Sequence, residues 1–471
     1  MSNQILEEML HPESIAIVGA SASGGRGAGF VTPLLELGFK GKIYPVNPKH
    51  PEILGMKAYA GIKDIPGNID YVISAIPAGA VLNLLEDCST KGVKVVHLFT
   101  AQFGETGRPE EAELEQAVLN KAREKGIRLL GPNCMGVYNP KQGIAFGDGF
   151  PKESGSVGLA FQSSYAAHDF VLLASPRGVR FSKVIGYGNA LDFNESDFLD
   201  YFTQDPETKI ILMYVEGPRD GKRFFQSLRR AAAVKPVIII KGGRGSAGAR
   251  AAASHTGSLA GPLKTWEAMV TQAGAIPAMD FDELIDLAVT FQFLPAIKGN
   301  RVGVAGGAGG PSVLAADQCE EAGLDVVPLP DEIREEMKSN GIPIWDWISN
   351  PADMSIAVGG AFTAGDMFQM MAVNDNFDLL IALVGEPHIH GVQRRMETEV
   401  FLKRFNLQVS KLKPLLVAMP DKSASVSAFS DANFELLCNV RTELINAGIP
   451  CYPSIGRAAR SVRKLIDYYR D

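Results

Sequence analysis

Short apolar runs alternate along the whole chain with longer stretches in which apolar residues recur at helical spacing. In the first third, such runs occupy residues 14–19, 42–46, 71–76, 93–99 and 127–130. Runs of this length are typical of buried strands, and their alternation with helices predicts parallel sheets. Prolines and asparagines then interrupt the pattern from Pro132 to Pro140, so we place a domain boundary near residue 145.

The rest of the chain repeats one order of elements. The run at 157–160 leads into Gln162-Ser163-Ser164, and the run at 302–305 leads into a turn that ends in Gly309-Gly310. The runs at 210–215 and 379–384 are also alike, and a Lys-Pro pair opens a further strand after each. This repetition predicts two similar doubly wound domains. We expect domains at 1–145, 146–297 and 298–471.

Composition narrows the function classes. The chain has 471 residues, 46% of them hydrophobic, and a net charge of -7 without any long basic run, so we expect no nucleic-acid partner. No apolar run approaches the ~20 residues that span a bilayer, and the first residues lack the apolar core of a signal peptide, so we expect no membrane association. Five scattered cysteines without a C-x-x-C pair indicate a reducing compartment and no zinc site. Together these observations predict a cytoplasmic protein.

Gly19, Ala20 and Ser21 open a glycine- and serine-rich loop between the first predicted strand and a helix. Loops at this position bind phosphates through backbone amides and a helix N-terminus. Where a dinucleotide site would place a carboxylate for the ribose, the chain has Val46-Asn47-Pro48-Lys49. Lys49 favours a ligand with an extra phosphate, such as NADP or coenzyme A, over NAD. The alternative is a loop that only turns the chain.

Two further turns have the composition of phosphate sites. Gln162-Ser163-Ser164 and the glycine turn that ends at Gly309-Gly310 each lie between a predicted strand and a predicted helix. Small residues there expose the first N–H groups of the helix, and the helix dipole adds partial positive charge. Two such helices aimed at one point would hold a phosphate. Ordinary turns of doubly wound domains are the alternative.

One histidine and one glutamate complete a candidate reaction centre. His255 lies among small residues and glycines in the segment 253–261, which suits a histidine that accepts and passes on a phosphoryl group. Glu216 follows the run at 210–215, where open sheets place their ligands, and could orient one imidazole nitrogen. A helix-capping histidine and a solvated glutamate are the alternatives. His388 and His390 have no third ligand nearby, so we predict no metal site, and we expect His97 in the core.

With these residues and a few specific motifs, the chain resembles the α subunit of NDP-forming (ADP-forming) acyl-CoA synthetases, which are relatives of succinyl-CoA synthetase. The motifs are Ser-His-Thr-Gly at 254–257, Gly-Pro-Asn-Cys at 131–134, the segment that starts at Thr100 and Asn-Pro-Ala-Asp at 350–353. The resemblance implies an α/β fold, with a Rossmann-like CoA-binding domain followed by two flavodoxin-like doubly wound parallel-sheet domains.

The resemblance also implies roles for individual residues. His255 would be the phosphorylated nucleophile and Glu216 its orienting carboxylate. Phosphate would be bound by the two helix starts and by Asn133, where the thiol meets the phosphate site. Coenzyme A would be bound by the Gly19 loop, Lys49, Pro77 and the segment from Thr100 that includes Glu105.

The implied reaction interconverts carboxylate, CoA and ATP with acyl-CoA, ADP and phosphate, through an acyl phosphate and a phosphohistidine. It requires an ATP-grasp domain, for which three α/β domains leave no room, so we expect a separate ATP-grasp β subunit that binds ATP or ADP with Mg²⁺ in an α2β2 heterotetramer. The resemblance implies a small carboxylic acid or its acyl-CoA as substrate, without indicating which acid. The sequence departs from the family pattern at Ser164, where glycine is usual.

Two other functions fit parts of the sequence. A non-catalytic module that senses CoA or acyl-CoA would use the first domain but would need neither His255 nor Glu216. An NADP-linked oxidoreductase would fit Lys49 and the Gly19 loop but would not explain the His255 segment.

Overall fold

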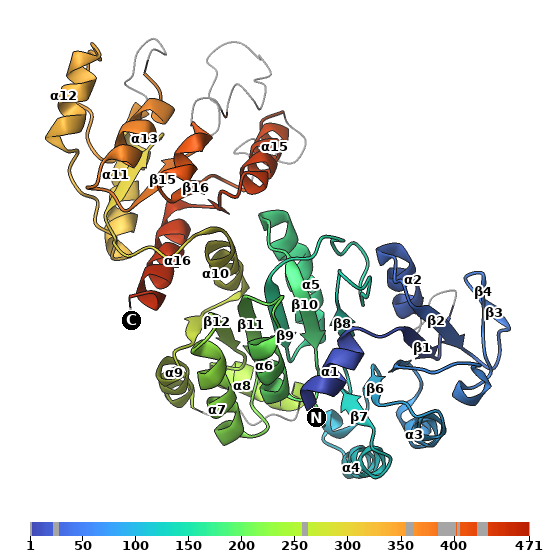
Figure 1. Cartoon of the computed structure of the whole chain (residues 1–471). Helices are drawn as coiled ribbons and strands as arrows, with labels where there is room; N and C mark the ends of the chain where they lie inside the picture. Colours follow the sequence, from blue (N-terminus) through green and yellow to red (C-terminus); the bar gives the residue numbers. More distant parts are fainter. Residues whose placement is uncertain are drawn as a thin grey trace. The chain divides into compact units, whose positions relative to one another are not determined.

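In the computed structural model, the described residues are 2–21, 28–256, 262–354, 362–384, 402, 406–421 and 432–470. They form two compact units, residues 1–284 and 285–471 (Figure 1). The first unit contains two mainly parallel sheets and the second contains one. The predicted α/β fold with parallel sheets is therefore confirmed, whereas the limits of the three domains stay a prediction.

The first sheet has five parallel strands in the order β2-β1-β5-β6-β7. All five coincide with the apolar runs predicted from the sequence: β1 (Ser14–Val18), β2 (Lys42–Val46), β5 (Tyr71–Ser74), β6 (Val95–Leu98) and β7 (Arg128–Leu130). Helices α3 (Val81–Thr90) and α4 (Pro109–Glu124) pack on the face that contains Val72 and Val96. Helix α2 (Ala28–Leu37) lies on the other face, where Phe30 contacts His97 edge to face. Figure 1 shows these helices on opposite sides of the sheet.

Shorter elements complete this part of the chain. Helix α1 (Ser2–Leu10) packs against helix α6 (Glu195–Gln204), and the Tyr201 hydroxyl donates a hydrogen bond to Glu7 (2.5 Å). The remaining elements are the hairpin β3 (Glu52–Ile53) and β4 (Met56–Lys57) and the 3-10 helices η1 (Ile62–Asp64), η2 (Ala78–Ala80) and η3 (Gly104–Thr106).

The second sheet has the strand order β13-β12-β11-β9-β10-β8. Its strands are β8 (Gly136–Tyr138), β9 (Val157–Phe161), β10 (Phe181–Gly186), β11 (Ile210–Val215), β12 (Val237–Lys241) and β13 (Ile276–Ala278). Only β8 is antiparallel to its neighbour, β10, among the strand pairs that the described residues form in this sheet. Although β8 precedes the predicted boundary near residue 145, it joins the second sheet.

Helices cover both faces of the second sheet. Phe161 of β9 contacts Phe170 of α5 and Phe281 of α10, so these two helices share one face. Gly158, which points to the opposite face of β9, lies against Phe202 of α6. The helices are α5 (Ser164–Ala174), α6 (Glu195–Gln204), α7 (Gly221–Ala232), α8 (Ser246–Thr256), α9 (Leu263–Gln272) and α10 (Phe281–Phe293), with the 3-10 helix η4 (Ser175–Arg177) after α5.

The second unit is built on a parallel sheet in the order β14-β15-β16-β17. Its strands are β14 (Val302–Ala305), β15 (Leu379–Leu383), β16 (Leu415–Ala418) and β17 (Cys451–Tyr452). The helices are α11 (Gly309–Glu321), α12 (Asp331–Ser339), α13 (Ala364–Val373), α15 (Ala432–Asn446) and α16 (Ile455–Tyr468), together with the 3-10 helix η6 (Leu407–Lys411). Helices α11 and α16 pack together, and α13 and α15 contribute to the main aliphatic core.

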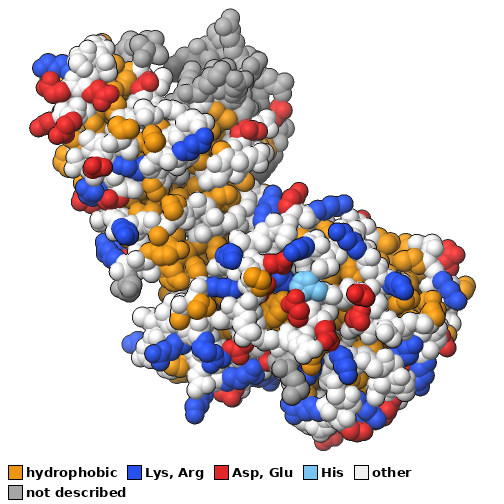
Figure 2. All heavy atoms as spheres, viewed as in Figure 1, with side chains coloured by type: hydrophobic (Ala, Val, Ile, Leu, Met, Phe, Trp, Pro, Cys, Tyr) orange, Lys and Arg blue, Asp and Glu red, His pale blue; other side chains and the backbone are white. Residues whose placement is uncertain are grey.

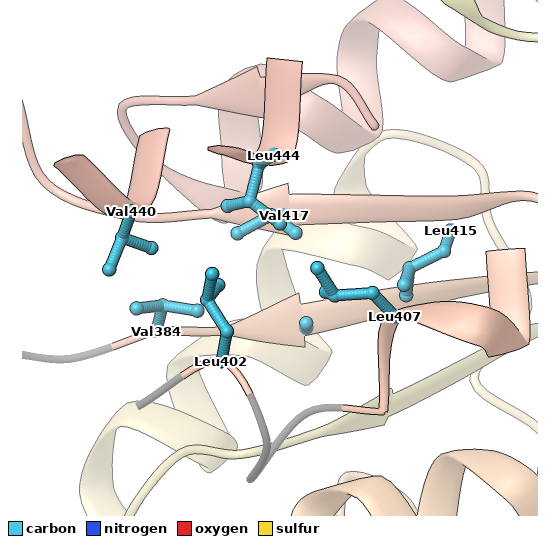
Figure 3. Close-up of a pocket in the computed structure, with 8 residues that line it drawn as sticks. Val384, Leu402, Leu407, Leu415, Val417, Val440 and Leu444 are labelled. Carbon is cyan, nitrogen blue, oxygen red and sulfur yellow. The ribbon is translucent and has the colours of Figure 1, made fainter. Parts of the chain in front are cut away.

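A small pocket in this core is lined by leucine, valine and alanine side chains (Figure 3). Val384, Leu402 and Leu407 converge on it with Val440 and Leu444 of α15. Because its lining is aliphatic, the pocket offers no group for acid–base or phosphoryl chemistry. On the face seen in Figure 2, acidic and basic side chains are interspersed. No helix in the described ranges is long and apolar enough to cross a membrane.

Candidate functional site

The carboxyl edge of the first sheet brings together the residues predicted to bind coenzyme A. The N–H groups of Gly19 and Ala20 donate to the carbonyl oxygen of Val46 at 2.9 and 3.3 Å, which ties the Gly19 loop to the end of β2. The Asn47 side chain donates to the Ala20 carbonyl (2.8 Å) and accepts from the backbone N–H of Lys49 (2.9 Å). The exposed Lys49 is therefore held beside Gly19, Ala20 and Ser21. Residues 22–27 of the loop lie outside the described residues.

Pro77 and Thr100 follow the neighbouring strands β5 and β6. Pro77 is exposed at the start of η2, whereas Thr100 is buried and its hydroxyl donates to the carbonyl oxygen of Ile76. The carboxyl ends of adjacent parallel strands share one edge, so both residues border the same edge as the Gly19 loop.

Glu105 uses its carboxylate to organise the chain around it. One oxygen accepts the N–H groups of Gln102 (2.6 Å) and Phe103 (3.2 Å). The other accepts the side-chain amide of Asn189 (2.6 Å), which lies in the loop after β10 of the second sheet. Glu105, predicted to bind the cofactor, therefore links the Thr100 segment to the second sheet.

Asn133 lies at the same junction. Its backbone N–H donates to the carbonyl oxygen of Thr100 (3.0 Å), and its side chain is 3.5 Å from the Asn189 carboxamide. The structure thus brings the predicted coenzyme A edge and the loops of the second sheet together at Asn133.

Glu216 is buried at the end of β11, with 4% of its surface exposed. This burial does not fit the alternative of a solvated glutamate. The Tyr214 hydroxyl donates to the Glu216 carboxylate (3.2 Å), and the side-chain oxygen of Gln162 accepts the N–H groups of Glu216 (2.8 Å) and Gly217 (3.3 Å). Gln162, predicted to bind phosphate, thereby fixes the loop that carries Glu216.

Lys241, at the end of β12, supports the same loop from the other side. Its ammonium donates to the carbonyl oxygens of Glu216 and Gly242, both at 2.5 Å, and lies 5.5 Å from the Trp266 ring centre. Burial lowers the pKa of Lys241, and the nearby Glu216 acts in the opposite direction. Burial also raises the pKa of Tyr214, which keeps its hydroxyl protonated as a donor to Glu216.

Arg219 and Glu195 hold the far end of this loop. The Arg219 N–H donates to the Glu195 carboxylate (2.9 Å), and the Arg219 guanidinium donates to the Asn189 carbonyl oxygen (3.1 Å). Glu195 is fully buried, and burial raises its pKa to about 7 although backbone N–H donors oppose the rise. Side chains from three neighbouring segments therefore fix residues 216–219.

Ser163 and Ser164 form the start of α5, as predicted. Ser163 is the N-cap, and its hydroxyl accepts the N–H of Ala166 at 3.4 Å. Ser164 is buried against Gly186 of β10, where a Cβ would lie 2.8 Å from the Ser164 Cβ and Oγ. The extra side chain relative to the usual glycine therefore packs toward the sheet.

Gly309 and Gly310 occupy the corresponding place in the second unit. They are exposed at the start of α11, directly after β14. The cis-Pro segment 350–353 lies beside them: the Ala352 N–H donates to the Val304 carbonyl oxygen, and a Cβ at Gly309 would lie 3.2 Å from an Asp353 carboxylate oxygen. That this helix start and that of α5 converge on one phosphate stays a prediction.

His255 lies in the last turn of α8, and its side chain is outside the described residues. The helix itself lies against η3, the short helix that contains Glu105. The histidine-bearing helix is therefore next to the Thr100 segment of the first domain.

Three other histidines had specific predictions from the sequence. His97 is fully buried, as predicted, and its Nε2 lies 2.8 Å from the Cys134 carbonyl oxygen. His388 and His390 lie outside the described residues. Among the described histidines, cysteines and carboxylates, no group of three could hold a metal ion.

Comparison with known proteins identifies the family. Residues 13–140 match a CoA-binding domain, and residues 154–291 match the flavodoxin-like domain of succinyl-CoA ligases. Acetate–CoA ligase [ADP-forming] II subunit α of Pyrococcus furiosus is 35% identical over 88% of this chain and 89% of its own length. The chain belongs to the ADP-forming acyl-CoA synthetase family. The resemblance read from the motifs is confirmed, and with it the assignment to acid–thiol ligases that use coenzyme A.

Two further members of the ADP-forming acyl-CoA synthetase family resemble this chain and differ in length. An acetyl-coenzyme A synthetase 1 of Candidatus Korarchaeum cryptofilum, solved with phosphate and ADP, has a TM-score of 0.80 at 28% identity and covers 98% of this chain and 96% of its own. An acetate–CoA ligase [ADP-forming] of Methanocaldococcus jannaschii is 39% identical over 74% of this chain, which is only 49% of that protein. The chain thus matches 89% of the Pyrococcus furiosus α subunit but only about half of the longer Methanocaldococcus jannaschii protein.

Sequence reasoning did not single out Tyr214, Asn189, Arg219, Lys241 or Glu195. Tyr214 and Lys241 lie at the carboxyl ends of β11 and β12, and this position is the signal that could have found them. The other three lie in loops or at a helix start, where their partners come from distant segments.

Proposed function

We propose that this chain is the α subunit of a ligase that interconverts carboxylate, CoA and ATP with acyl-CoA, ADP and phosphate, with His255 as phosphoryl carrier. The observation that carries this proposal is the buried Glu216 carboxylate on a loop held by Gln162, Lys241 and Glu195. A rigidly held carboxylate that receives a hydrogen bond from Tyr214 suits the orientation of an imidazole.

The role of Glu216 follows from its surroundings. Inside the protein a carboxylate interacts more strongly with a cationic or hydrogen-bonding imidazole than it would in water. By accepting an N–H from one ring nitrogen of His255, Glu216 would leave the other nitrogen with its lone pair free to attack phosphorus. The phosphorus–oxygen bond to the acyl group would break, a phosphorus–nitrogen bond would form, and the carboxylic acid would leave as carboxylate.

The residues at the edge of the first sheet fit coenzyme A. The start of the Gly19 loop is tied to the end of β2, Lys49 is exposed beside it, and Pro77 and Thr100 border the same edge. Coenzyme A supplies the thiol that accepts the acyl group. Asn133, bonded to Thr100, would lie where that thiol meets the acyl phosphate.

The helix starts would hold the phosphate. At the N-terminus of α5, Ser163 uses its hydroxyl as a cap, and the first backbone N–H groups of the helix have no partner within the helix. Gly309 and Gly310 offer the same donors at the start of α11. Two helix N-termini would stabilise a dianionic phosphate through hydrogen bonds and the helix dipole.

A partner subunit would complete the enzyme. Relatives named α subunits, and a relative about twice as long as the matched segment, support a separate chain that carries the ATP-grasp domain and binds ATP or ADP with Mg²⁺. We infer an α2β2 assembly.

A phosphoryl-labelling experiment tests the function. The purified chain is incubated with radiolabelled phosphate and a panel of acyl-CoAs, beside His255→Ala and Glu216→Gln variants. We expect acid-labile, base-stable label on the wild type, none on His255→Ala, and on Glu216→Gln a labelling rate lower by about 100-fold or more, since the neutral amide cannot stabilise a charged imidazole. The acyl-CoA that gives the most label would identify the substrate.

The same experiment separates the ligase from a regulatory module. Acyl-CoA that binds tightly without any label on the wild type would contradict the phosphohistidine mechanism and favour a sensor. Label that persists in His255→Ala would place the carrier on another residue.

A further inference from the structure

Asn189 lies at a buried junction between segments and has no assigned role in the proposed reaction. It is 1% exposed and lies in the loop between β10 and α6. Gly188, directly before it, is pressed against the 131–134 turn, since a Cβ there would lie 2.2 Å from the Pro132 carbonyl oxygen and 2.5 Å from that of Asn133. No residue with a side chain fits at 188 without moving this turn.

Three polar groups of Asn189 bind three different segments. The side-chain amide donates to Glu105 (2.6 Å), and Glu105 in turn holds the N–H groups of Gln102 and Phe103. The backbone N–H donates to the Pro132 carbonyl oxygen (3.0 Å), and the backbone carbonyl accepts from the Arg219 guanidinium (3.1 Å). Asn189 thus joins the Thr100 segment, the 131–134 turn and the loop that begins with Glu216.

Backbone strain is concentrated at this junction. Gln102 (φ 76°), Asn133 (φ 57°) and Ala190 (φ 54°) are in the left-handed region without being glycine. The described chain has five such residues, and three lie in the segments that meet at Asn189. Such conformations are strained, persist only where the surroundings enforce them, and cluster at functional sites.

We propose that Asn189 is a positioning residue that fixes the coenzyme A edge relative to the Glu216 loop. The inference rests on the proposed function. Acyl transfer needs the thiol, the acyl phosphate and the phosphoryl carrier in one arrangement, and a displacement of about 1 Å can slow such a step by about 100-fold. Phosphorylation of the carrier by ATP does not involve the thiol, so it does not depend on the contacts of Asn189.

The test removes the hydrogen bond between Asn189 and Glu105 with one substitution and restores it with a second. In Asn189→Asp the new carboxylate faces that of Glu105, and the two repel each other. In the double variant Glu105→Gln with Asn189→Asp, the amide of the new glutamine can donate to the new carboxylate while its oxygen still accepts the N–H groups of residues 102 and 103. Asn120→Asp, the same change at an exposed position of α4, is the matched control. All variants are assayed with an ATP-grasp partner.

For Asn189→Asp we expect labelling from acyl-CoA and phosphate, and kcat of the complete ligase reaction, to fall by about 30- to 100-fold. Labelling from ATP and KM for CoA should stay within about threefold, and the double variant should regain most of the lost kcat. Asn189→Ala, which removes the repulsion, should lose less than Asn189→Asp.

Several outcomes would overturn the inference. Equal losses in both labelling reactions would mean that Asn189 only supports the fold. Unchanged kcat in Asn189→Asp would mean that the contact between Asn189 and Glu105 has no role in the reaction. A double variant with the same kcat as Asn189→Asp would rule out the Glu105 contact as the cause of the loss. The kcat comparison does not depend on where the label resides. Absent label with the expected kcat pattern would therefore count against His255 and leave the role of Asn189 intact.

Discussion

At the scale of single residues, neighbouring side chains hold both the backbone and the carboxylate of Glu216 in place. Gln162 and Lys241 bind the N–H and carbonyl groups of the loop, and Tyr214 binds the carboxylate. Each comes from the carboxyl end of a different strand: β9, β12 and β11. This arrangement fixes one rotamer and one backbone path, which is the preorganisation that an orienting carboxylate requires.

His97 provides a prediction about pH and stability. Burial lowers its pKa to about 4, whereas an unfolded histidine titrates near 6.5. The unfolded chain therefore binds a proton between these values while the folded chain does not, so stability falls as the pH drops from about 6.5 to about 4, by about 3 kcal/mol in total. His97→Gln keeps a donor for the Cys134 carbonyl oxygen but cannot titrate.

Urea unfolding of the full chain at about pH 7 and about pH 4.5 would measure this effect. The loss of unfolding free energy on acidification should be smaller in His97→Gln than in the wild type by about 2 kcal/mol. His50→Gln, at an exposed position, should behave like the wild type. Equal acid sensitivity of His97→Gln and the wild type would show that His97 titrates normally.

The residues of the site were predictable to different degrees. Glu216 and Ser163 could be predicted because they directly follow apolar runs that had to be strands. Asn189 and Arg219 could not, because their importance comes from contacts with Glu105 and with each other, 84 and 30 residues away in the sequence. The sequence around Asn189 and around Arg219 contains no local pattern that predicts these contacts.

At the scale of elements, the contact between β10 and α5 explains how the chain accommodates Ser164. Gly186 leaves room for the serine side chain, and the two residues are 22 positions apart on neighbouring elements. The sequence did not indicate β10, because its buried Lys183 breaks the apolar pattern. That lysine is compensated by Asp205 (2.9 Å) and Glu207 (2.7 Å), which only the fold brings near. Continuous apolar runs such as β9 and β11 were correctly predicted.

This contact leads to a prediction on stability. Gly186→Ala places a methyl group against Ser164, and we expect a loss of about 1–3 kcal/mol of unfolding free energy through overpacking. Adding Ser164→Gly should restore most of it. Urea unfolding measures both, with Gly221→Ala as control, since a Cβ at Gly221 meets no atom within 4 Å. If the double variant is as unstable as Gly186→Ala alone, Ser164 is not the residue that fills the space.

At the scale of the whole molecule, we propose that the chain contains the parts of the site that bind CoA and orient the carrier, and we expect the nucleotide site on another subunit. Incubation of the chain with labelled ATP and Mg²⁺ should give no label, and addition of an ATP-grasp β subunit should give label on the wild type but not on His255→Ala. The measurement is acid-labile, base-stable radioactivity after gel separation. Turnover of ATP by the chain alone would contradict the need for a partner.

Strand β8 links the two sheets of the first unit in a way that affects how the chain can be divided. The strand begins two residues after the 131–134 turn and pairs with β10. Gly136 lies opposite Gly186, Val137 opposite Ile185 and Tyr138 opposite Val184. A fragment that starts at residue 146 would leave β10 as an open sheet edge with unpaired backbone groups, the kind of edge that recruits a foreign strand. Fragments designed to contain the second sheet should therefore begin before Gly136, or be supplied with this strand as a separate peptide.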